Sequence, residues 1–303
     1  MFADAAATGP PVRLLPVIVG FDYLAVPGNG RTGLTREPDP WNGKANRYSH
    51  FFDSAGVLFS AGKRAQALSG APLSGTALAR LRASLPADRR NGDLTYRDAF
   101  VRHVVERLVD EFEPGAPLEA YRWLIHSWEV CAEPEMCTRE PGSADDGRPV
   151  ANDDMRAYLR EAIRQVNLRG FRTTVGYQHA ETITSWGAYL TGDIGQFHYY
   201  ADRPLHSVTP GQAAMIGETS STARAPFDLE FGRMLGRWPN SLQERLEWFE
   251  YKGYREVFLW SAERRPSNRL ASWTESEHRQ IAAFNLGLRV LGLRNRLRTP
   301  ARR

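Results

Sequence analysis

Short apolar runs of strand length alternate along this chain with segments whose apolar residues recur at helical spacing. A continuous apolar run rich in β-branched residues is typical of a strand buried on both faces, and such strands occur mainly in parallel sheets covered by helices. The run 13–24, RLLPVIVGFDYL, has this character and follows a Pro-Pro pair. The alternation therefore predicts an α/β protein built on a parallel sheet.

The segments that carry this alternation can be placed from their periodicity and their end signals. The expected strands are residues 13–24, 121–130, 171–178, 193–200, 213–220 and 254–262. The expected helices are residues 74–85, 94–112, 152–170, 241–253 and 274–291. Thr95 with Asp98 offers a capping start for helix 94–112. An Asn/Asp N-cap and a glycine stop at Gly170 bound helix 152–170.

The length of 303 residues suits one large α/β domain or two small ones. We expect a single barrel-like domain over 1–290, with a long loop insertion at about 25–93 and a basic tail over 291–303. The first residues lack the pattern of a signal peptide, and no apolar run reaches the ~18 residues of a membrane-spanning helix. A cytoplasmic location follows if the start is genuine, and secretion stays open if the N-terminus is truncated.

The positive charge is carried almost entirely by arginine. The net charge is +4, the sequence pI is about 9.2, and the only lysines are Lys44, Lys63 and Lys252. A nucleic-acid partner needs basic residues gathered on one face, whereas these arginines are scattered apart from the tail RNRLRTPARR. We therefore expect neither a nucleic-acid nor a membrane partner.

The sequence holds no pattern for a metal or a cofactor. Its two cysteines, Cys131 and Cys137, match no zinc-binding spacing. They could close a small loop disulfide in an exported protein, and free thiols are at least as expected in a reducing compartment. No spacing of His, Asp and Glu predicts a metal site, and no Ser-His-Asp order is present.

Most of the expected strands end in polar or aromatic residues. These are Asp22, Glu133, Gln178, His198 with Tyr200, Glu218 and Trp260. A doubly wound sheet concentrates its site at one switch point, and no GxGxxG motif or P-loop follows any of these strands. Functional side chains at the C-terminal ends of many strands are instead typical of a (β/α)8 barrel, so the predicted fold is of the TIM-barrel type.

Two of these strand ends carry a glutamate, Glu133 in WEVCAEP and Glu218 in MIGETS. Glycoside hydrolysis needs two carboxyl groups that face one another. One protonates the leaving oxygen, and the other attacks the anomeric carbon or activates water. The paired glutamates therefore predict cleavage of a glycosidic bond.

The same stretches resemble the (β/α)8-barrel retaining glycoside hydrolases of the cellulase and endo-β-mannanase type. In that group strand 4 ends in Trp-Glu-x-x-Asn-Glu-Pro, which residues 128–134 match except at Ala132. Strand 6 ends in His-x-Tyr, as at residues 198–200, and strand 7 carries a Gly-Glu pair, as at residues 217–218. Strand 8 ends in a Trp, as at Trp260.

The resemblance implies a retaining β-glycosidase without a cofactor, acting on a β-linked glucan, mannan or related polysaccharide. Glu133 would be the acid/base, and Glu218 would be the nucleophile that forms a glycosyl-enzyme. Tyr200 would hydrogen-bond Glu218 and keep it ionised. His198 would line the site and contact the sugar or an acid.

The other implied binding residues are mainly aromatic. Trp260 would stack on an apolar face of the sugar, and Trp128 and Tyr177 would lengthen that platform. Asp22 is a candidate for a different reason, because it is a polar residue at the end of the strand 13–24.

Two features depart from the pattern of the group. Ala132 lacks the amide that would contact the sugar 2-hydroxyl, and the loss of such a contact can cost several kcal/mol. The run 14–24 resembles strand 3, so strands 1 and 2 have no room before it and the barrel is expected to be incomplete at its N-terminus. These departures keep open a carbohydrate-binding pseudoenzyme, and a nucleic-acid-binding protein is a weaker third interpretation.

Overall fold

The structure is a computed structural model that divides into two compact units, residues 1–197 and 198–303. It describes residues 13–20, 67–139, 150–186, 190, 192–199, 205, 215–220, 242–254 and 256–260. Each described pairing between strands is parallel, and helices lie between the strands in sequence. The predicted α/β class is therefore confirmed.

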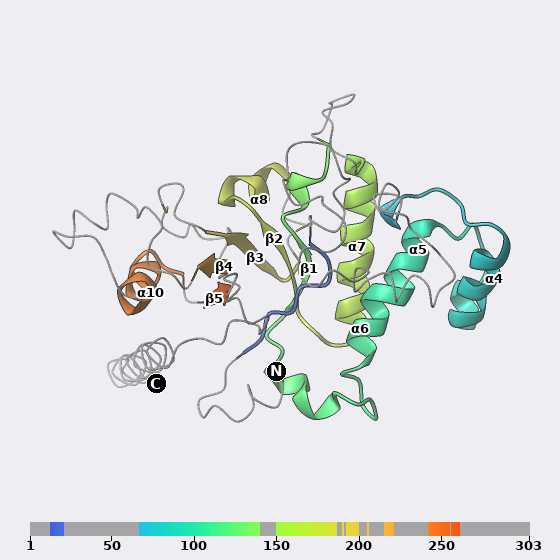
Figure 1. Ribbon diagram of the computed structural model, residues 1–303, viewed down its shortest axis with the longest axis horizontal. Coiled ribbons are helices and arrows are strands. Elements are labelled where there is room, and N and C mark those ends of the chain that lie inside the picture. Colours follow the sequence, from blue (N-terminus) through green and yellow to red (C-terminus); the bar gives the residue numbers. More distant parts are fainter. Residues whose placement is uncertain are drawn as a thin grey trace, which may run out of the picture. The chain divides into compact units, whose positions relative to one another are not determined.

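The strands of the first unit run side by side in sequence order (Figure 1). Strand β1 (Trp128–Ala132) pairs with β2 (Thr173–Tyr177), which pairs with β3 (Ile194–His198). Residues 13–20 lie parallel beside β1 through isolated bridges rather than a continuous ladder. The prediction of a buried strand at 13–24 is confirmed only in part: residues 13–20 run parallel to the segment 125–132 but form no continuous strand, and residues 21–24 lie outside the described residues.

The predicted strand 121–130 is wrong in its first half. Residues Glu119–Leu124 form the 3-10 helix η4, and the strand begins only at Trp128. The amide of Tyr121 donates to the carbonyl of Leu118, which closes a turn, and Trp123 remains 47% exposed. A short apolar run cannot by itself distinguish a buried strand from a helical turn, so this boundary was misplaced.

The predicted helix 94–112 is confirmed as one helical stretch with an irregular centre. It comprises α5 (Tyr96–Phe100), the π-helical turn η3 (Val101–Glu106) and α6 (Arg107–Asp110). The predicted capping box is present, because Thr95 accepts from the amide of Asp98 while the Asp98 carboxylate accepts from the amide of Thr95. Within the predicted loop 25–93, α4 (Gly75–Ser84) confirms the expected helix 74–85.

Helix α7 (Asn152–Leu168) lies between the strands β1 and β2 and the helical stretch 96–110 (Figure 1). It ends as predicted, since Gly170 adopts a φ of 71° that a residue with a side chain rarely takes. Its predicted Asn/Asp cap is wrong, because Ala151 occupies the cap position and no side chain caps the helix.

Aromatic rings fill the space between this helical layer and β1. Trp128 packs edge-on against Phe112 at 5.6 Å and Phe171 at 6.1 Å between ring centroids. The guanidinium of Arg122 lies 3.8 Å from the centroid of the Phe171 ring. The side of β1 that carries Trp128 is therefore the helix-covered side. A further short helix, α8 (Ala180–Trp186), follows β2 and was not predicted.

The second unit repeats the strand–helix–strand order. Strand β4 (Met215–Ser220) and β5 (Glu256–Trp260) pair in parallel, and α10 (Leu242–Tyr251) precedes β5. The predicted elements 213–220, 241–253 and 254–262 are confirmed with shorter bounds, whereas the predicted helix 274–291 lies outside the described residues. None of the helices in the described ranges is long and apolar enough to cross a membrane.

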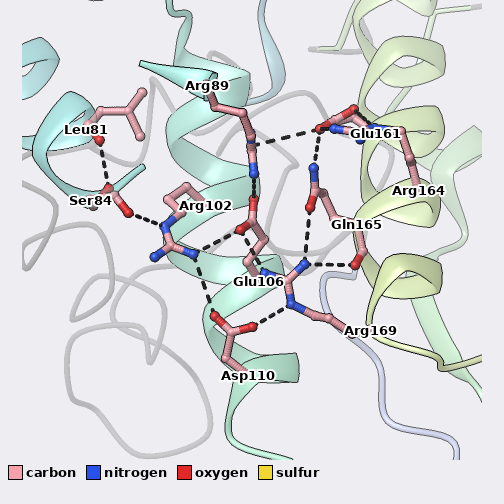
Figure 2. A network of polar contacts seen from close by, with 10 residues as sticks. All are labelled: Leu81, Ser84, Arg89, Arg102, Glu106, Asp110, Glu161, Arg164, Gln165 and Arg169. Atoms are coloured by element: carbon pink, nitrogen blue, oxygen red, sulfur yellow. Dashed lines mark hydrogen bonds and ion pairs between the residues drawn. The ribbon is translucent and has the colours of Figure 1, made fainter. Parts of the chain in front are cut away.

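A buried carboxylate ties the helical stretch 96–110 to α7 (Figure 2). Glu106 is 1% exposed and lies 2.7 Å from Arg89, 2.9 Å from Arg102 and 2.9 Å from Arg169. Arg102 and Arg169 also pair with Asp110. Three guanidinium groups from different elements thus converge on one carboxylate, which fixes how these helices pack.

Glu161 extends this network along α7 (Figure 2). Its carboxylate accepts two hydrogen bonds from Arg164, at 2.9 and 2.7 Å, and one from Gln165 at 2.8 Å. Burial alone would raise the pKa of Glu161, but the hydrogen bonds from Arg164 and Gln165 and the charges of Arg164 and Arg89 outweigh burial and lower it.

The variant Glu106→Gln should lower the free energy of unfolding by about 3 kcal/mol or more. The reason is that three partly buried guanidinium groups lose a shared charged partner. Urea unfolding measures the loss. Glu111→Gln is the matched control: its partner Arg107 is 66% exposed, so the loss should be about 0.5 kcal/mol or less. Equal, small losses in both variants would contradict the central role of Glu106.

The lowered pKa of Glu161 makes part of the stability sensitive to acid. Its contribution is complete above the ordinary value of 4.5 and is lost as the pH falls through the lower value of the folded state. Glu161→Gln should therefore unfold more easily than the parent at neutral pH, and the difference should be smaller at an acid pH below 4.5. Urea unfolding at both pH values checks this, and a difference independent of pH would refute it.

Candidate functional site

Glu133 directly follows the last residue of β1, at the carboxyl end of the parallel strands of the first unit. Its side chain is 9% exposed. Its amide donates to the carbonyl of Gly176 in β2 at 2.5 Å, and its carbonyl accepts from the amide of Met136 at 3.0 Å. Met136 ends the 3-10 helix η5 (Pro134–Met136). These bonds hold Glu133 at the point where the chain leaves the sheet.

The backbone of Glu133 adopts a left-handed conformation with φ 50° and ψ 52°. Among the described residues it is the only non-glycine with a positive φ. This conformation costs an L-residue about 1–2 kcal/mol, and a residue before proline normally prefers extended backbone. Strained residues of this kind cluster at active sites and ligand clamps, so the observed outlier makes Glu133 a functional candidate.

The two strands that carry the candidate carboxylates share a backbone irregularity. Between Glu129 and Ala132, β1 uses one more residue than its partner β2, and between Ile216 and Thr219, β4 uses one more than β5. Such bulges re-aim side chains and occur often beside active sites. In β1 the extra residue lies between Glu129 and Ala132, just before the strand end that leads to Glu133, and in β4 it lies in the stretch that contains Glu218.

The face of the sheet opposite the helices carries buried polar side chains. Glu129 follows Trp128, so it lies on that opposite face. Its register partner Thr174 lies there too. On β3, Ile194 pairs with Thr174, and Gln196, two residues after Ile194, lies on the same face. The exposed fractions of Glu129, Thr174 and Gln196 are 1%, 0% and 0%. The Thr174 hydroxyl donates to the carbonyl of Ile194 at 2.8 Å.

Gln196 belongs to a register row that is otherwise made of small residues. Gly20 bridges to Ala132, Ala132 pairs with Gly176, and Gly176 pairs with Gln196. Three neighbouring chain segments thus contribute only one methyl group to this row. Ala132–Gly176 is the last pair between β1 and β2, so Glu133 directly follows this row of small residues, and the carboxamide of Gln196 lies two strands away in the same row.

The predicted binding residues of the first unit have core contacts. Trp128 is 3% exposed and packs between aromatic rings on the helix-covered side. Tyr177 is fully buried, and its hydroxyl donates to the carbonyl of Leu190 at 3.4 Å. These contacts describe packing, and they lend no support to a sugar platform at either residue.

The remaining predicted site residues are placed less fully. His198 ends β3 and is 3% exposed. Glu218 and Trp260 lie on β4 and β5, as predicted for strand residues, and only their backbone is described. Asp22 and Tyr200 lie outside the described residues. Their roles, and those of Glu218 and Trp260, remain predictions from sequence.

The segment that flanks Glu133 is held by further contacts. The Glu135 carboxylate accepts from the amide of Gln178 at 2.5 Å, which ties this segment to the end of β2. Cys131 and Cys137 are both buried and are not joined in a disulfide, so of the two alternatives that the sequence left open the structure has the reduced thiols. The Cys137 thiol lies 3.4 Å from the carbonyl of Pro134.

This collection of groups suits proton transfer and the binding of hydroxyl groups. Within the ranges that the structure describes, no group of three His, Cys, Asp or Glu residues could hold a metal ion. The polar side chains of this strand end and of the buried face of the sheet carry carboxyl, hydroxyl and carboxamide groups. Sequence reasoning missed Thr174 and Gln196, although a glutamine inside the otherwise apolar strand IGQFH is a detectable anomaly.

Comparison with known proteins adds no relative: no family model, curated protein or solved structure was found to match this chain.

The left-handed backbone of Glu133 predicts an unusual order of stability. The free energy of unfolding of Glu133→Gly should exceed that of Glu133→Ala by about 1 kcal/mol, because glycine tolerates positive φ. Both variants lack the carboxylate, so its loss does not enter the comparison. Urea unfolding compares the pair. At Glu135, inside η5, the order should be reversed and alanine should be the more stable. If alanine is also more stable at 133, the strain is not real.

Proposed function

We propose that this protein is a retaining glycoside hydrolase that cleaves β-linked glucan- or mannan-type chains. The observation that carries the proposal is Glu133: a buried carboxyl group at a strand end, on a strained backbone, immediately after a bulge. A strand that served only for packing would not need a buried acid in a left-handed conformation at its end. The same one-residue bulge in β4, around Glu218, adds support.

The buried polar face supports the barrel that this function implies. Parallel strands that carry helices on one face need the other face buried as well. In a (β/α)8 barrel the strands bury that face against one another, and the carboxyl ends of the strands form the active site. Glu129, Thr174 and Gln196 are buried on the face away from α7, as side chains inside a barrel would be.

The proposed reaction uses Glu133 and Glu218 in two displacements. Glu133 gives its proton to the leaving glycosidic oxygen while the Glu218 carboxylate attacks the anomeric carbon and forms a glycosyl ester. Water then attacks the same carbon and gives a proton to Glu133, and the ester bond breaks to release the Glu218 carboxylate. The product keeps its β-configuration. His198, Tyr200 and Trp260 would position the sugar.

A second candidate is a carbohydrate-binding protein without turnover. It is favoured by Ala132, the residue before Glu133, whose methyl group cannot hydrogen-bond to a sugar hydroxyl. This candidate predicts that oligosaccharides bind without cleavage, and that substitution of Glu133 leaves the affinity unchanged.

Glu133→Gln should lower kcat/KM for cellohexaose or mannohexaose by about 10²–10⁴-fold, because a positioned acid contributes that much to proton transfer. Glu218→Gln should lose at least as much, since it removes the attacking carboxylate. Product analysis by chromatography gives the rates, and proton NMR of the fresh product gives the anomer.

Glu181→Gln is the control for this test, because Glu181 is an exposed acid on α8 and its replacement should leave the rate unchanged. A Glu218→Gln variant as fast as the parent would overturn the nucleophile assignment. Binding of the oligosaccharides without any cleavage by the parent would favour the second candidate.

A further inference from the structure

Gln196 is a buried side chain whose hydrogen-bonding capacity is unmet. It is 0% exposed, and within the described part of the chain neither Oε1 nor Nε2 has a hydrogen-bond partner. Leaving a buried amide without partners destabilises the folded state, and native proteins keep few such groups. A carboxamide of this kind therefore calls for a partner that the described residues do not supply.

Few side chains near Gln196 could hydrogen-bond to its carboxamide in place of a ligand. Its row neighbours Gly176 and Ala132 carry no polar side-chain atom, and two strand spacings, about 10 Å, separate Ala132 from Gln196. The nearby Thr174 hydroxyl is already engaged with the carbonyl of Ile194 at 2.8 Å. Glu133 is the next residue after Ala132, so the carboxamide and the proposed acid adjoin the same row of small residues.

The chemistry of the group defines the ligand. A carboxamide carries one acceptor oxygen and two N–H donors and has no charge. A hydroxyl group is also both donor and acceptor, so the two match without leaving a charge unpaired. An anionic or cationic ligand would instead require an opposite charge, which Gln196 does not provide. Neutral hydroxylated ligands such as sugars fit these requirements.

We infer that Gln196 is a substrate-binding residue whose carboxamide hydrogen-bonds to a hydroxyl of the sugar unit held beside Glu133. This inference rests on the proposed function, which it deepens. Ala132 on β1 offers no hydrogen bond to the sugar, and Gln196 supplies one from β3 across Gly176. A site built to bind a hydroxyl group rejects analogues that lack it, because its buried polar group then stays unpaired.

The variant Gln196→Met tests this assignment, since methionine keeps the shape of glutamine and removes the amide. Calorimetric binding of cellohexaose and of mannohexaose, together with kcat/KM for their hydrolysis, provides the functional readout. The affinity or kcat/KM for the preferred sugar should fall by about tenfold or more. The midpoint of thermal unfolding should not fall, because the variant removes a buried amide that has no partner.

Gln165→Met is the matched control. Gln165 is also buried, at 3% exposure, but its amide is paired: Nε2 donates to Glu161 at 2.8 Å and Oε1 accepts from Arg169 at 3.1 Å. This variant should therefore unfold at a lower temperature and keep the sugar affinity of the parent. The two variants separate a ligand-binding amide from a structural one by opposite outcomes.

A series of monodeoxy sugars sharpens the test. If Gln196 binds one hydroxyl, the effect of Gln196→Met should disappear for the one analogue that lacks this group and persist for the others. A lower unfolding temperature with unchanged binding would overturn the inference and make Gln196 structural. Sugar binding that depends on Gln196 without any cleavage would support the inference while refuting the hydrolase. Absence of any sugar binding by the parent would overturn both.

Discussion

One extra residue in β1 determines which side chains reach the carboxyl end of the first unit. Because β1 advances three residues from Glu129 to Ala132 while β2 advances two, Ala132 rather than Cys131 falls beside Gly176. Glu133 then meets the carbonyl of Gly176 through its amide and turns into a left-handed conformation as the chain enters η5. Without this bulge the buried thiol of Cys131 would occupy the small-residue row, and the acid would leave the sheet at another angle.

The helical layer supplies the rigid support that a strained strand end requires. The carboxylate of Glu106 gathers three arginines from separate elements, and α7 lies against both that network and β1. The Tyr158 hydroxyl on α7 donates to the carbonyl of Val130 at 2.8 Å, three residues before Glu133. Strain at one residue persists only where neighbouring contacts over-determine the backbone, and the layer behind β1 provides such contacts.

The sequence predicted the order of strands and helices well, and it predicted local chemistry unevenly. The capping box at Thr95 and the end of α7 at Gly170 depend on interactions within a few residues, so the local sequence predicted both. The strand start at Trp128 was misplaced because the apolar run 121–125 suits a helical turn as well as a strand. Such a run carries no information on which of the two the rest of the fold stabilises.

The candidate site shows the same division between local and long-range information. Glu133 stood out because acids and a proline follow an apolar run. Gln196 did not, because its importance comes from Gly176 and Ala132 on other strands, and pairing register is absent from a single sequence. Trp128 was expected at a sugar platform, yet one step of alternation turns it toward Phe112 and Phe171.

The two buried thiols give this region its own reporter of motion. Cys131 and Cys137 bracket Glu133, and both are fully shielded from solvent. A thiol reagent can reach them only when the segment or the whole unit opens, so modification that is faster than global unfolding measures local opening around the acid. Because both native thiols are shielded, a cysteine introduced on the surface would react faster than either of them. Opening of this segment can therefore be followed by the kinetics of thiol modification without introducing a new residue.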